Sequence, residues 1–125
     1  MITVSDQVFE RLVEEAVASI PRKFADHLEN VSFMVAQEPT REQLGKHAGL
    51  HGRVTLLGLY EGIPLPSRTG NYSGVLPDVL TVFKRPHEMA AHDMEGLAKL
   101  VHQTVWHEVA HYFGLGHGQI RELER

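Results

Sequence analysis

The chain has 125 residues, a formal net charge of −4, 42% apolar residues and 22% charged residues. This size suits a single domain over residues 1–125, and the composition excludes intrinsic disorder. The charge disfavours nucleic acid as a partner, no apolar run approaches the roughly 20 residues that cross a bilayer, and the absence of cysteine excludes disulfides and thiolate metal sites.

The N-terminal segment has the pattern of an amphipathic helix. Ser5 can cap this helix, and apolar residues recur at spacings of three and four up to Val17, before Pro21. Residues 1–12 contain acidic side chains and lack the apolar segment and cleavage site of a signal peptide. We therefore expect a cytoplasmic protein.

The middle of the chain alternates between strand-like and irregular segments. Residues 31–36 and 54–60 are rich in branched and aromatic side chains, which predicts two strands that are each buried on at least one face. We interpret residues 38–52 as a loop with one helical turn within 41–47. The glycine and proline content of residues 62–77 excludes regular structure. This long segment is either the rim of an active-site cleft or a plain connector.

The last part of the chain predicts one more strand and a long helix. The strand covers Val79 to Phe83, and Pro86 begins a new segment. Asp93 can cap a helix that runs to about Phe113, because apolar residues recur along it at helical spacing. Gly114 then supplies the stop signal.

The predicted last helix carries a motif with the spacing of a metal site. His107, Glu108, His111, Gly114 and His117 form the pattern H-E-x-x-H-x-x-G-x-x-H. On an α-helix His111 lies about 40° around the axis and one turn along from His107, so both imidazoles can reach one ion. Gly114 allows the turn that brings His117 to the same ion. Three histidines leave the fourth position of zinc open for water, which Glu108 can reach as a general base.

Chance is a poor explanation for this motif. A shuffled copy of the chain would contain H-E-x-x-H roughly one time in twenty, and Gly114 with His117 lowers that to below about one in a thousand. The sequence therefore predicts one zinc ion (Zn2+) per chain. The other histidines have no such spacing and are predicted to be ordinary surface or core residues: His27, His47, His51, His87, His92 and His102.

At these residues the sequence resembles the zincin superfamily, and the extended motif resembles the metzincin clan. The resemblance is closer to a family of minimal bacterial zincin-like metallopeptidases, and residues 56–62, 64–65, 76–78 and 85–86 also look like that family's pattern. Metzincins carry a methionine turn after the third histidine, whereas no methionine follows His117. The chain thus resembles metzincins in its motif only.

The resemblance implies an α+β, zincin-like fold, in which a small mixed β-sheet packs against an N-terminal helix and a long C-terminal zinc-binding helix. It also implies a zinc metallopeptidase, specifically a metalloendopeptidase, that hydrolyses peptide bonds of a peptide or protein substrate through a zinc-activated water, with Glu108 as general base. The substrate would lie extended along an edge strand beside the metal, for which Val79 to Phe83 is the candidate.

Two other functions stay open. A family of RNA-maturation hydrolases shares the histidine spacing of the motif but has glycine in place of the motif glutamate, so Glu108 favours the peptidase. A non-catalytic zinc-binding module would fill the open metal position with a protein side chain, for which Glu122 and Glu124 are available. The sequence does not indicate an oligomeric state.

Overall fold

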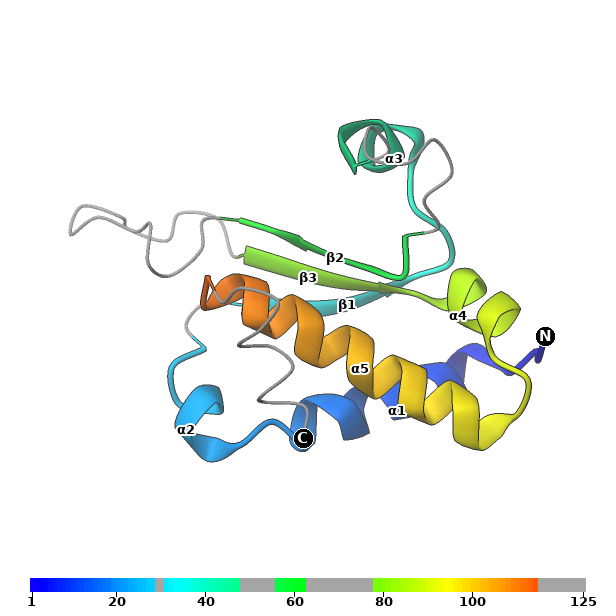
Figure 1. The fold of residues 1–125 in the computed structure, drawn as a ribbon, viewed down its shortest axis with the longest axis horizontal. Coiled ribbons are helices and arrows are strands. Elements are labelled where there is room, and N and C mark those ends of the chain that lie inside the picture. Colours follow the sequence, from blue (N-terminus) through cyan, green and yellow to red (C-terminus); the bar gives the residue numbers. More distant parts are fainter. Residues whose placement is uncertain (29–30, 48–55, 63–77, 115–125) are drawn as a thin grey trace.

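The computed structural model describes residues 1–28, 31–47, 56–62 and 78–114, and these residues form an α+β fold with helices on both sides of one small sheet (Figure 1). The long helix α5 and the N-terminal α1 lie on one side, and α3 lies on the other. None of the described helices combines the length and apolar character that a membrane crossing requires. In chain order the elements are α1 (Asp6–Ala18), α2 (Arg22–Ala25), β1 (Val31–Ala36), α3 (Arg41–His47), β2 (Gly58–Glu61), β3 (Asp78–Phe83), α4 (Lys84–Ala90) and α5 (Met94–Tyr112).

The sheet is mixed, as expected, and its strand order is β1-β3-β2. β1 pairs with β3 in parallel, with Phe33 opposite Leu80, and β2 pairs with β3 antiparallel, with Tyr60 opposite Leu80. The expectation that β3 is an edge strand is therefore wrong, because its backbone pairs with a neighbour on each side. Five of its six residues are buried, and such a nearly continuous buried run is typical of a central strand.

The predicted ends of the two long helices are confirmed. The Ser5 hydroxyl oxygen accepts a hydrogen bond from the Val8 N–H at 3.2 Å, and the Asp93 carboxylate accepts one from the Gly96 N–H at 2.7 Å. Each bond satisfies a backbone donor that the first turn of a helix leaves without a partner. Gly114 has a φ of 70°, so α5 ends in the left-handed turn that glycine adopts at little cost.

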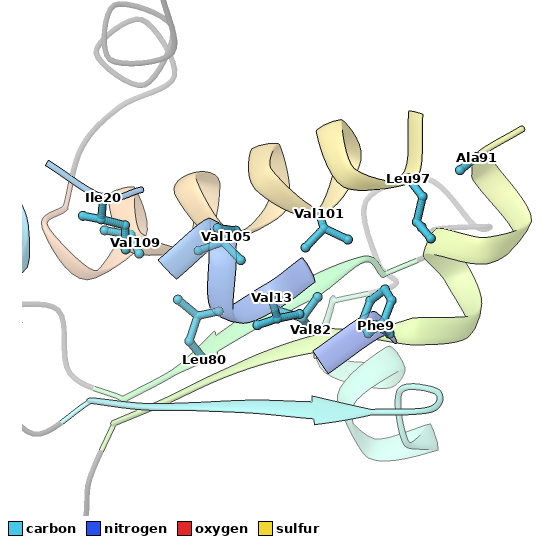
Figure 2. Packing of buried hydrophobic residues seen from close by; sticks show 11 residues of the cluster. Phe9, Val13, Ile20, Leu80, Val82, Ala91, Leu97, Val101, Val105 and Val109 are labelled. Atoms are coloured by element: carbon cyan, nitrogen blue, oxygen red, sulfur yellow. The ribbon is translucent and has the colours of Figure 1, made fainter. Parts of the chain in front are cut away.

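The hydrophobic core lies between β3 and the facing sides of α1 and α5 (Figure 2). Both helices place apolar residues at spacings of three and four on this side, so each buries one stripe. The described residues contain no buried side-chain nitrogen or oxygen without a hydrogen-bond partner. The central side chains of this core are Phe9, Val13, Leu80, Val82, Leu97, Val101, Val105 and Val109.

Several middle elements differ from the expectation. Residues 41–47 form the complete helix α3, because Thr40 and Gln43 cap it reciprocally, with the Thr40 N–H donating to Gln43 Oε1 and the Gln43 N–H to Thr40 Oγ1. β2 begins at Gly58, whereas Leu56 and Leu57 precede the strand. The predicted residues 54–55 of that strand, and residues 63–77 of the predicted irregular segment, lie outside the described residues.

Candidate metal centre

The last turns of α5 bring three chemically active side chains together. Metal-binding atoms of His107, Glu108 and His111 all lie within 4.8 Å of one another. The two imidazole centroids are 4.6 Å apart, because residues separated by four positions lie on the same side of a helix. His117, the third predicted ligand, lies outside the described residues, as do Glu122 and Glu124.

Glu108 and His111 differ in exposure and contact each other. The Glu108 side chain is 6% exposed and that of His111 is 43% exposed, and Glu108 Oε1 lies 3.3 Å from His111 Nδ1. This hydrogen bond raises the pKa of His111, while partial burial opposes the rise. The contact engages Nδ1, so Nε2 is the imidazole nitrogen of His111 that it leaves for a metal. The Glu108 carboxylate thus lies beside the imidazole of a candidate metal ligand and is almost fully covered by protein.

These side chains line a cleft of about 600 Å3 between α5 and the segment that contains β2. Residues 56–60 form one wall of the cleft, and β2 is the outer strand of the three described strands on this side. The strand beside the site is therefore β2, in place of the expected β3. The other wall consists of six α5 side chains, those of Leu100, Gln103, Thr104, His107, Glu108 and His111.

The part of this α5 wall that precedes His107 was not predicted from the sequence. Leu100 and Gln103 precede His107 by seven and four residues, and helical spacing alone would have placed them on the same side. The contribution of β2 had no comparable signal, because it depends on how the strand packs against the helix.

The donor chemistry of the cluster fits zinc. Imidazole nitrogens are borderline donors that zinc prefers, and structural and catalytic zinc sites commonly take two of them from one helical turn. The adjacent Glu108 carboxylate is nearly buried and lies within reach of an ion held by the two imidazoles, as a general base must. His107 and His111 could therefore hold the ion.

The other described histidines take no part in this cluster. His102 is exposed and lies next to Trp106, with ring centroids 5.7 Å apart. His87 is completely buried, with Nδ1 at 2.6 Å from the Phe83 carbonyl oxygen and Nε2 at 2.8 Å from Thr104 Oγ1. His87 is thus a core residue that joins the start of α4 to the middle of α5. His51 and the side chain of His47 lie outside the described residues.

Burial of His87 predicts a pH dependence of stability. Desolvation lowers the pKa of His87 from its usual 6.5, although the hydrogen bond with Phe83 opposes the shift. The unfolded chain therefore binds a proton first as the pH falls below about 6.5, and the free energy of unfolding decreases from there through the lower native pKa. We expect His87→Gln, which cannot titrate, to cost about 1–3 kcal/mol at pH 7.5, and the deficit to shrink toward pH 5. Urea unfolding of both chelator-treated proteins measures this, and a deficit that does not change with pH would contradict it.

The comparisons with known proteins agree with the fold and the motif. The family model described as zincin-like metallopeptidase matches residues 28–125, a range that contains His107, Glu108, His111 and His117. A solved structure of a conserved hypothetical protein from Thermus thermophilus is similar, with a TM-score of 0.59 and 24% identity, covering 88% of this chain and 94% of the other. That likeness supports the fold alone. No curated protein matches the chain. Because the family model covers most of the sequence, the chain belongs to the zincin-like metallopeptidase family.

Proposed function

We propose that the protein is a zinc-dependent peptidase, in which His107, His111 and His117 hold the metal and Glu108 is the general base. One observation carries the proposal: the donor atoms of His107, Glu108 and His111 lie within 4.8 Å of one another in the wall of a cleft. Family membership independently suggests metal-dependent hydrolysis. A peptide or protein is then the substrate, and the cytoplasmic location stays a prediction.

Each residue of the cluster has a distinct task. His107 and His111 project from successive turns of one helix, which fixes their separation before any metal binds. When bound, zinc would supply an activated water and polarise the scissile carbonyl. The Glu108 carboxylate accepts a proton from the attacking water and later returns it to the leaving amine. Glu108 Oε1 lies 3.3 Å from His111 Nδ1, and this contact restricts the orientation of the carboxylate.

The substrate is proposed to lie extended along β2. Residues 56–60 run along one wall of the cleft, so their backbone groups are positioned to pair with a peptide as a further strand would. Leu56, Leu57 and Leu100 give the cleft an apolar part, whereas Gln103 is the polar side chain one turn before His107. In this arrangement β2 holds the backbone of an extended peptide, and Glu108 faces the peptide from the α5 wall.

Removal of one ligand tests the metal assignment. We expect the wild type to contain about one zinc per chain and to cleave a mixed peptide library. His111→Ala is expected to weaken zinc binding by more than the roughly 10- to 100-fold loss that follows from removing a residue that only orients a ligand. Elemental analysis and mass spectrometry of the digested library measure both effects. His102→Ala is the matched control, because His102 is an exposed histidine on the same helix that lies outside the cluster.

Three results would overturn the proposal. Equal zinc content in the wild type and His111→Ala would show that His111 is not a metal ligand. A protein that holds zinc and cleaves RNA, but leaves the library intact, would belong to the rival hydrolase class. Zinc binding without cleavage of either polymer would identify a non-catalytic zinc module. The presence of Glu108, in place of glycine, and the net charge of −4 argue against the RNA hydrolase.

A further inference from the structure

We propose that Gly58 positions Glu108 through a close contact between β2 and α5 in which Thr104 is the fixed partner. This inference rests on the proposed role of Glu108 as general base. Gly58 is the first residue of β2 and pairs with Val82, a core residue on the helix side of the sheet. Residues opposite each other in a strand pair lie on the same face, so the bare Cα of Gly58 faces α5.

The strand and the helix approach more closely than any side chain would allow. A Cβ at Gly58 would lie 2.5 Å from Thr104 Cγ2, 3.3 Å from Glu108 Cγ and 3.4 Å from the Thr81 carbonyl oxygen. The φ of Gly58 lies outside the left-handed region, so backbone conformation does not require glycine here. Glycine is needed for space alone, at the point where β2 passes the candidate base.

Thr104 cannot readily rotate away from this contact. Its hydroxyl lies 2.8 Å from His87 Nε2 and 2.9 Å from the Leu100 carbonyl oxygen, and His87 itself is completely buried. A rotation that moved Cγ2 away from Gly58 would break both hydrogen bonds within the protein interior. The fixed Thr104 methyl therefore limits how closely β2 can approach α5.

The stem of Glu108 shares the same surface. Glu108 follows Thr104 by four residues, so the two side chains lie one above the other on α5. Its Cγ lies beside the space that a Cβ at Gly58 would occupy, and its carboxylate lies 3.3 Å from His111 Nδ1, so the side chain is confined at both ends. A methyl at position 58 would displace this stem or separate β2 from α5, and either change moves the base.

The test combines Gly58→Ala, which adds a methyl group, with Thr104→Ser, which removes one. Misplacement of a reacting group by about 1 Å can cost about 100-fold, so Gly58→Ala is expected to lower kcat about 100-fold with the zinc content nearly unchanged. Thr104→Ser keeps the hydroxyl and removes Cγ2, the atom at 2.5 Å. The double variant Gly58→Ala/Thr104→Ser is therefore expected to recover to a kcat about two- to tenfold below that of Thr104→Ser, because the added Cβ still lies 3.3 Å from Glu108 Cγ. Gly45→Ala is the matched control, because a Cβ there meets nothing within 4 Å.

Each outcome decides the proposal. Unchanged kcat in Gly58→Ala, or no recovery in the double variant, would overturn it. If Gly58→Ala does not fold, the double variant is compared with Thr104→Ser, and the remaining contact at 3.3 Å to Glu108 Cγ is expected to lower kcat measurably. Equal kcat for these two folded proteins would overturn the role.

A structural readout separates this inference from the proposed function. If the wild type cleaves no peptide, the peptidase proposal fails, and crystal structures of zinc-free wild type, Gly58→Ala and the double variant still test the positioning. We expect Glu108 Oε1 to leave His111 Nδ1 in Gly58→Ala and to return in the double variant. A Gly58→Ala structure that keeps the 3.3 Å contact would show that Gly58 does not position Glu108.

Discussion

Replacement of Glu108 by glutamine is expected to lower peptide hydrolysis by about 10²- to 10⁴-fold while the zinc content stays at the wild-type level. Glutamine has nearly the same shape and can remain in the narrow space between Gly58 and His111, but its amide does not accept a proton as a base. The ligands on α5 are unchanged. Single-turnover cleavage of a library-derived peptide, combined with elemental analysis, measures the two quantities on the same samples.

Glu95→Gln provides the control for this prediction. Glu95 is an exposed carboxylate in the first turn of α5, so the same chemical change occurs on the same helix, outside the metal cluster. We expect full activity for this variant. Glu108→Gln with wild-type cleavage would show that another group takes the proton, whereas loss of zinc from Glu108→Gln would make Glu108 a ligand in place of a base.

Truncation of Phe9 is expected to be the most damaging change in the core. Phe9 is completely buried on α1, and its ring lies 5.6 Å from that of His87. Phe9→Ala removes a large ring and leaves a cavity, which typically costs about 3–5 kcal/mol of unfolding free energy. Whole domains are stable by only about 5–15 kcal/mol, so the variant should have a sharply lower urea midpoint. Chelator-treated protein is used so that bound metal does not add to the measured stability.

Met89→Ala tests whether burial causes the Phe9 effect. Met89 is 62% exposed on α4, so its truncation is expected to change the unfolding free energy by no more than about 0.5 kcal/mol. Similar losses in the two variants, or a loss below about 1 kcal/mol for Phe9→Ala, would show that α1 is not an essential part of the core.

The sequence predicted those parts of the protein in which local chemistry decides the structure. Ser5 and Asp93 mark helix starts because their side chains accept hydrogen bonds from backbone donors three residues onward, and Gly114 marks an end through its own backbone freedom. The meeting of His107 with His111 follows in the same way from helical geometry alone.

Two local signals in the sequence were missed. Thr40 and Gln43 form a capping box, which would have predicted all of α3. Pro86 was interpreted as the start of a segment, but α4 already begins at Lys84, because a helix tolerates proline within its first turn.

Other features depend on contacts that no local pattern contains. The central position of β3 follows from its pairing with a strand on each side, and the closeness of Gly58 to Thr104 depends on how β2 packs over α5. Glycine at the start of a strand can also serve a bulge or a bend, so its steric role is visible only in the folded protein. The cleft itself is a product of this packing.

The strand order has a consequence for how the chain folds during synthesis. β1 ends at Ala36, yet its partner β3 begins only at Asp78, so the ribosome releases β1 long before β3 is synthesised. α5, which covers the apolar side of the sheet, follows the three strands that the structure describes. Contacts between such distant segments slow folding and leave apolar strands exposed to aggregation. We therefore expect productive folding to begin only after α5 has emerged, and nascent chains that stop before it to depend on chaperones.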